Sequence, residues 1–138
     1  MSNDRRGVLR HGLEACITGA VDALPELFTD DVSGWSPNML VSSLDELKQV
    51  VADHDDSLSD VSVDVNALDV FGNKGVVEYR VNATFSGPFV ISEDAVIPPN
   101  GRRILLGGAL VAEFSGDRIS GFRNYFDDAA LIDQMMQA

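Results

Sequence analysis

Cysteine and basic residues are scarce in this sequence, and each scarcity excludes a class of structure or function. The chain of 138 residues has one cysteine, Cys16, so no disulfide can form within it. Its 10 basic residues stand against 22 acidic ones. The resulting net charge of −12 argues against binding to nucleic acids or anionic membranes, because both need a basic surface.

Histidine and long apolar runs are also lacking. The two histidines, His11 and His54, are far apart, and neither has a second ligand at the spacing of a metal site, so we expect no metal. The glycines of 72–75 form a turn, and we expect no phosphate group to bind there because no helix follows it. We expect no cofactor. No apolar run could span a bilayer and no secretory signal opens the chain, which favours a cytoplasmic protein.

What the sequence does contain is the length and composition of one folded domain, 1–138. Apolar residues make up 45% of it. In the first part, apolar residues recur at helical spacing over 4–23, and a short second helix is expected over 24–28. Ser43 and Glu46 form a capping box that predicts a helix ending near His54. Between these helices, 32–36 reads as a short extended piece.

From Val61 the apolar period changes to two, which is typical of half-buried strands. The predicted order is a strand from 61, a hairpin turn at 72–75, strands over 76–87, 103–114 and 118–126, and a helix over 129–136, with a loop over 88–101. Strands joined by tight turns are antiparallel, and helices in a block make the class α+β. We expect the first helices to cover one face of a sheet bent at Gly107 and Gly108, leaving a cavity between them.

Two stretches resemble a known group of proteins. The stretch 119–127, Ile-Ser-Gly-Phe-Arg-Asn-Tyr-Phe-Asp, is similar to the closing strand of the NTF2-like superfamily, and more narrowly of its SnoaL-like, polyketide cyclase-like group. The stretch 78–89, from Glu78 to Phe89, resembles that group's middle strand. The resemblance implies a conical α+β barrel with a deep pocket, and a homodimer packed through the outer face of the sheet.

The resemblance also indicates which residues to inspect. It implies that Asp127 is the acid or base, with Arg80 as its charged partner; the histidine that such cyclases carry in the middle strand is absent from 83–85. Limonene-epoxide hydrolases pair an Arg-x-Asp with a later aspartate, and here Arg80 is followed by Asn82 instead. Tyr125 shares a strand face with Asp127 and could bind a substrate oxygen.

Each of these residues has a structural alternative. Asp127 could simply cap the last helix, and Arg80 could lie on a solvated or dimer-facing strand surface. Tyr125 could be ordinary core. Three further residues are candidates for binding the substrate, with core packing as the alternative: Trp35, Met39 and Phe85.

The leading hypothesis is an enzyme without a cofactor, of the isomerase, cyclase or lyase type. It would act on a mostly apolar substrate bearing a carbonyl, using Asp127, Arg80 and Tyr125 as catalytic residues and Asn82 for binding. The rival is a small-ligand-binding or dimerising domain without catalysis, favoured by the absent histidine and by Asn82. Hydrolysis of an epoxide is a further alternative.

Overall fold

The computed structural model describes residues 4–53 and 57–137, and helices stand at both ends of the chain. The helical elements are α1 (Arg5–Thr18), the 3-10 turn η1 (Val21–Ala23), α2 (Leu24–Leu27), α3 (Leu44–Asp53) and α4 (Asp128–Met135). The strands are β1 (Phe28–Ser36), β2 (Met39–Val41), β3 (Leu58–Phe71), β4 (Lys74–Phe85), β5 (Phe89–Ser92), β6 (Ala95–Ile97), β7 (Arg103–Ser115) and β8 (Arg118–Phe126). The expected α+β class is confirmed.

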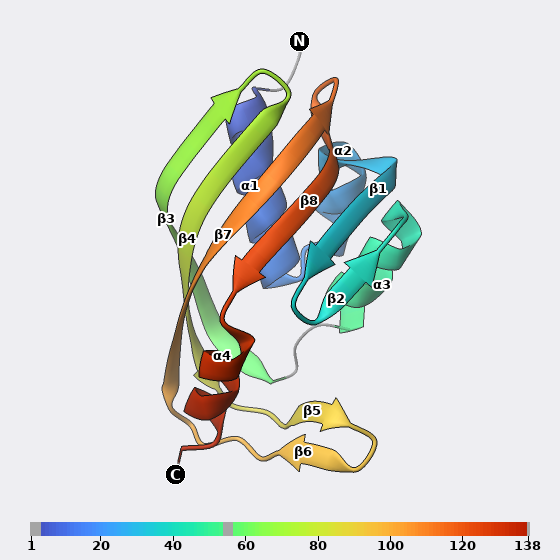
Figure 1. The fold of residues 1–138 in the computed structure, drawn as a ribbon. Helices are drawn as coiled ribbons and strands as arrows, with labels where there is room; N and C mark the ends of the chain where they lie inside the picture. The colour runs from blue at the N-terminus through green and yellow to red at the C-terminus, as the bar shows by residue number, and fades with distance from the viewer. Residues whose placement is uncertain (1–3, 54–56, 138) are drawn as a thin grey trace.

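Six strands form one curved sheet in the order β2-β1-β8-β7-β4-β3 (Figure 1). The pairs β3–β4 and β7–β8 are antiparallel, as the tight turns between them predict, and β4–β7, which are joined through the β5–β6 segment, are antiparallel as well. Strand β1 lies parallel to β8, so the sheet is mixed. No hairpin joins β1 to β8, and nothing in the local sequence therefore sets its direction.

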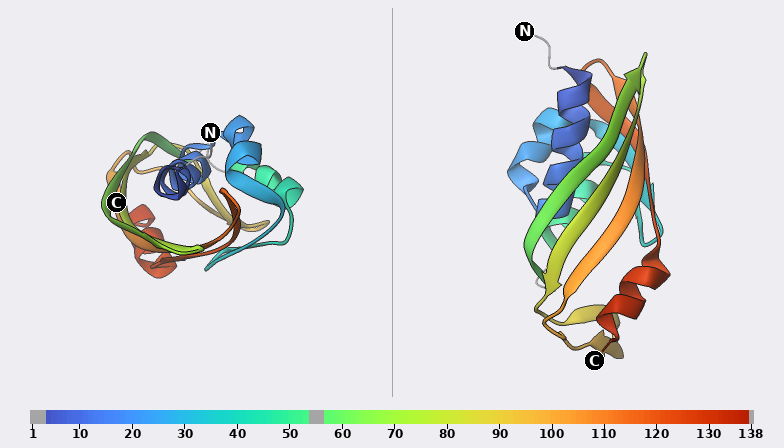
Figure 2. Two further views of the ribbon diagram at one scale, coloured as in Figure 1. Left: turned by 90° about the horizontal axis from the view of Figure 1, so that it is seen from above. Right: turned by 90° about the vertical axis from the view of Figure 1, so that its left-hand side faces the viewer.

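The sheet wraps around α1, as the view from above in Figure 2 shows. Apolar side chains from α1, α2, α3 and the concave face of the sheet form one cluster, called here the upper core; among its fully buried members are Leu9, Leu24, Leu47 and Val77. A second cluster, the lower core, joins α4 to the far end of the sheet and comprises Phe85, Ile97, Ile104, Leu131 and Met135.

Capping residues explain where two of the helices begin and end. Asp4 accepts a hydrogen bond from the backbone N of Arg6 at the start of α1, and Gly19, at a φ of 81°, ends it in the left-handed conformation that glycine adopts most readily. At α3, the Oγ of Ser43 accepts from the backbone N of Glu46 at 3.1 Å, which confirms the predicted cap. The predicted end of this helix near His54 lies outside the described residues.

The structure corrects several predicted boundaries. The first helix ends at Thr18 instead of continuing to 23, and β3 begins at Leu58. The expected loop over 88–101 contains the hairpin β5–β6, in which Phe89 is opposite Ile97. The prolines at 98 and 99 obscured this pairing in the sequence, because they interrupt the alternation directly after β6.

Gly107 and Gly108, where the sequence predicts that the sheet bends, carry no bulge against β4. The pairing of β7 with β4 continues through both residues without a shift. The shifts lie instead in β3, between Ser59 and Ser62 and between Val65 and Ala67, and in the β7–β8 pairing after Glu113. No helix among the described residues is long and apolar enough to cross a membrane.

Candidate functional site

Asp127 lies at the junction of β8 and α4, one residue before the helix begins. Its Oδ1 accepts a hydrogen bond from the backbone N of Ala130 at 3.0 Å, and the side chain is exposed. The sequence-based alternative that Asp127 caps the last helix is therefore confirmed. Its other oxygen, Oδ2, forms no hydrogen bond with any described residue and can contact other molecules.

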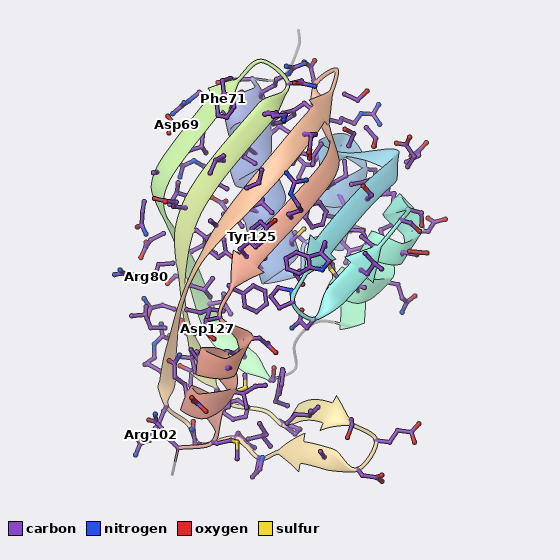
Figure 3. All side chains as sticks on the ribbon, viewed as in Figure 1. Asp69, Phe71, Arg80, Arg102, Tyr125 and Asp127 are labelled. Atoms are coloured by element: carbon purple, nitrogen blue, oxygen red, sulfur yellow. The ribbon has the colours of Figure 1, made fainter. Side chains whose placement is uncertain are left out.

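Arg80 and Asn82 lie on the convex face of the sheet. The register places Arg80 opposite Asp64 of β3 and Gly107 of β7, and its side chain is exposed. Figure 3 shows Arg80, Tyr125 and Asp127 at separate places on the molecule. Within the described part of the chain, no hydrogen bond or ion pair joins Arg80 to Asp127, so the expected partnership is not formed. The alternative of an exposed strand surface is what the structure shows for Arg80.

Tyr125 and Trp35 meet each other, also on the convex face. Their ring centroids are 5.2 Å apart, and the side chains are 47% and 40% exposed. Beside them, Nη1 of Arg123 forms an ion pair of 3.0 Å with Oε1 of Glu113, and this hydrogen bond raises the pKa of Arg123. A hollow of about 390 Å³ opens here, and Trp35, Glu113 and Arg123 are among its lining residues. Two of the predicted site residues, Trp35 and Tyr125, are thus in contact, but on the convex face of the sheet.

Met39 and Phe85 contribute to the two cores. Met39 is half-buried and packs against the upper core from β2. Phe85 is fully buried in the lower core. A second hollow, of about 490 Å³, lies between the segment after β6 and the end of α4, where Ile97 and Met135 are among its lining residues.

The concave face carries a polar pair that the sequence-based reading did not single out, Tyr79 and Asn124. The hydroxyl of Tyr79 donates a hydrogen bond of 2.6 Å to Oδ1 of Asn124. Tyr79 stands on β4 and is 3% exposed, whereas Asn124 stands on β8 and is half-buried. The only available signal was that Asn124 interrupts an apolar alternation between Phe122 and Phe126.

Gly108 of β7 allows this pair to form across an intervening strand. The register puts Gly108 between Tyr79 of β4 and Phe126 of β8. A Cβ atom at Gly108 would lie 2.5 Å from the hydroxyl oxygen of Tyr79 and 2.6 Å from its Cζ. The tyrosine ring therefore lies directly over the bare backbone of Gly108, and its hydroxyl reaches the next strand.

The surroundings of the pair are apolar. Inward positions next to it along β4 and β7 are Val77, Val81, Leu106 and Leu110. Burial raises the pKa of the Tyr79 phenol, and the side-chain hydrogen bond with Asn124 offsets part of this rise. The phenol accordingly stays protonated at neutral pH. The pair can bind a neutral polar group, but it holds no carboxylate to move a proton.

Other reactive groups lie away from this pair. Cys16 packs against the upper core, and burial raises the pKa of its thiol to about 12, so it is not a thiolate nucleophile at neutral pH. Across residues 4–53 and 57–137, no three histidine, cysteine, aspartate or glutamate side chains are grouped in a way that could hold a metal ion.

Solved structures similar to this chain share its whole architecture. A proposed polyketide cyclase from Acidithiobacillus ferrooxidans superposes with a TM-score of 0.81 at 20% identity, covering 100% of this chain and 98% of that one. A SnoaL-like polyketide cyclase from Agrobacterium tumefaciens gives 0.72 at 17% identity, with 96% and 98% covered. An LEH-like epoxide hydrolase from M. tuberculosis gives 0.71 at 12% identity, with 98% and 91% covered. At these identities the likeness shows the fold, which is NTF2-like.

A comparison with curated protein sequences finds no significant match. The sequence model of one family, described as SnoaL-like polyketide cyclase, matches residues 7–135. That match spans nearly all of the chain, and it agrees with the fold and with the resemblance of the two strand motifs. The chain belongs to the SnoaL-like polyketide cyclase family.

Proposed function

We propose that this protein binds a mostly apolar small molecule on the concave side of its sheet, beside Tyr79 and Asn124, and carries out isomerase-, cyclase- or lyase-type chemistry on it without a cofactor. The observation that carries the proposal is the hydrogen bond of 2.6 Å between these two side chains on an otherwise apolar face. A few polar groups among apolar walls is the usual composition of a small-molecule site. Membership of the family supports the reaction class.

Asp127 is the proposed acid or base. It directly follows the end of β8, three residues after Asn124, and at about 3.3 Å per residue of extended chain their Cα atoms lie roughly 10 Å apart. Two side chains and a bound molecule of one or two rings can bridge that separation. The free Oδ2 of Asp127 supports the role, because capping of α4 uses only Oδ1.

Substitution of Asp127 separates its structural role from its chemical one. Asparagine caps a helix about as well as aspartate, so Asp127→Asn keeps α4 intact but removes the proton acceptor. The measurement is deuterium exchange of the methyl protons of 2-acetylnaphthalene in D2O, followed by NMR. We expect the wild type to accelerate exchange and Asp127→Asn to lose about 10²-fold or more of that acceleration.

Asp128→Asn is the matched control, since it removes the neighbouring carboxylate in the first turn of α4. It should leave the acceleration unchanged. Equal rates for Asp127→Asn and the wild type would remove Asp127 from the mechanism.

The second candidate is a small-ligand-binding domain without catalysis. It is favoured by the exposure of Asp127 and by the amide, in place of an acid, at Asn124. Binding of 2-acetylnaphthalene without any acceleration of exchange by the wild type would decide for this candidate. Epoxide hydrolysis is not proposed, because Arg80 and Asn82 lie on the convex face, apart from Asp127.

We also propose that the protein is a homodimer packed through the convex face of the sheet. Support comes from the apolar and aromatic side chains exposed there, which include Trp35, Leu40 and Tyr125. The hollow beside Trp35 lies on the same face and would be covered in such a dimer.

A further inference from the structure

The hydrogen bond between Tyr79 and Asn124 determines which atom of the Asn124 amide faces Tyr79, and which atom faces away from it. Oδ1 of Asn124 is occupied, because it accepts from the hydroxyl of Tyr79 at 2.6 Å. A side-chain amide has one oxygen acceptor and one NH₂ donor group, so holding the oxygen toward Tyr79 turns Nδ2 the other way.

Nδ2 of Asn124 has no partner within the described part of the chain. No buried side-chain nitrogen or oxygen of the described residues is left without a hydrogen bond. An unpartnered Nδ2 is therefore not fully enclosed by the protein, and Asn124 is a half-buried residue. Since a polar group among apolar side chains gains most from a hydrogen bond, this donor is a ready contact for a ligand.

The hydroxyl of Tyr79 cannot reverse the arrangement by losing its proton. Burial raises the pKa of the phenol, which keeps the donor in place at neutral pH. The ring cannot swing easily either, because it is 3% exposed and lies against the backbone at Gly108.

We propose that Asn124 is a donor-only recognition group that selects ligands by an acceptor oxygen, such as a ketone, aldehyde or ester carbonyl, and that Tyr79 is the positioning residue that sets this selectivity. The inference concerns the same site as the proposed function and rests on that function. It predicts that the preferred substrates carry a carbonyl group, and not a hydroxyl group, next to Nδ2 of Asn124. A hydroxyl in that place would have to use its oxygen alone, with its own proton left unpaired.

Three naphthalenes of similar shape test the inference. 2-Acetylnaphthalene offers an acceptor, 1-(2-naphthyl)ethanol offers a hydroxyl in its place, and 2-ethylnaphthalene offers neither. Their dissociation constants for the wild-type protein are measured by ligand-observed NMR. We expect the ketone to bind roughly tenfold more tightly than the alcohol and the hydrocarbon, as one added hydrogen bond allows.

Two substitutions then test the assigned roles. Tyr79→Phe frees the amide to turn, so the ketone and the alcohol should bind within about threefold of each other, while binding of the hydrocarbon stays unchanged. Asn124→Ala should abolish the preference for the ketone over the hydrocarbon. The matched control is Tyr125→Phe, which removes the hydroxyl of the other tyrosine, on the convex face, and should keep the wild-type preference.

The outcomes separate this inference from the proposed function. Failure of all three compounds to bind contradicts the proposed function itself. Equal binding of all three to the wild type upholds the apolar site but overturns the selectivity. A preference for the alcohol would mean that Oδ1 faces the ligand and would overturn the assigned polarity. A Tyr79→Phe protein with undiminished preference would overturn the positioning role of Tyr79.

Discussion

Gly108 determines where the ring of Tyr79 can lie. Its replacement by alanine would place a methyl group 2.5 Å from the tyrosine hydroxyl oxygen and 3.0 Å from the backbone oxygen of Tyr125. The strand backbone is fixed by pairing on both sides, so the tyrosine must move and its bond to Asn124 must break. Overpacking of this kind costs about 1–3 kcal/mol.

Gly107→Ala is the matched control, since the nearest atom to its added Cβ is the backbone O of Tyr79 at 3.9 Å. Urea denaturation should show a loss of about 1–3 kcal/mol for Gly108→Ala and a change within roughly 0.5 kcal/mol for Gly107→Ala. Similar values for both variants would show that the close approach of Tyr79 to β7 is not maintained in solution.

Strand alternation predicted which side chains share a face, but not which polar residues meet. On β4, Arg80 and Asn82 do lie on the other face of the strand from Tyr79 and Val81, as the period of two requires. The pair of Tyr79 and Asn124 was missed because 45 positions separate them and a third strand lies between them. Only the registers of β4 with β7 and of β7 with β8 bring them together, and a long-range register is not written in either segment.

Helix α4 is held in place by side-chain hydrogen bonds at its C-terminal end. The side-chain amide of Gln134 pairs with the backbone N and O of Leu105, both at 2.9 Å, as a neighbouring strand would. Nδ2 of Asn100 donates to the carbonyls of Gln134, Met135 and Gln137, at 3.1, 3.3 and 2.9 Å. These carbonyls lie in the last turn of the helix and just after it, where few backbone donors remain, so Asn100 supplies a donor that the backbone lacks.

Asn100→Asp reverses this contact with almost no change in shape. A carboxylate in place of Nδ2 would face the helix carbonyls and the negative end of the helix dipole, so we expect a loss of about 1–3 kcal/mol. Amide hydrogen exchange should increase across 131–137, where Met135 packs into the lower core. Asn73→Asp adds the same charge at an exposed hairpin turn and should leave exchange in α4 unchanged. Unchanged exchange in both variants would contradict the capping role of Asn100.

At the level of elements, the sequence predicted the helices and the antiparallel meander because caps and tight turns are local signals. Ser43 with Glu46 is one such signal, and the glycine turn at 72–75 is another. The parallel contact of β1 with β8 and the pairing of Phe89 with Ile97 in the β5–β6 hairpin were not foreseen. Both depend on contacts that form only when the whole sheet has assembled.

Charge is distributed unevenly over the whole molecule. The chain carries a net charge of −12, yet the convex face of β3, β4, β7 and β8 presents five basic residues against five acidic ones. The basic ones are Lys74, Arg80, Arg103, Arg118 and Arg123, and the acidic ones are Asp60, Asp64, Asp69, Glu78 and Glu113. Two copies that approach through this face therefore bring together surfaces without the chain's overall excess of negative charge.

The same face offers apolar side chains for such a contact, and Leu40 is 80% exposed there, opposite Trp35 in the β1–β2 pair. Leu40→Asp adds a negative charge and removes an apolar contact, and it should shift the protein from dimer to monomer by at least tenfold in dissociation constant. Sedimentation equilibrium measures the change. Ile91→Asp makes a similar substitution on the β5–β6 hairpin, where the side chain is 50% exposed, and should leave the dimer intact. A wild-type protein that sediments as a monomer at all concentrations, or an Ile91→Asp protein that alone dissociates, would contradict a dimer through the convex face, because the interface would then be absent or lie on the hairpin.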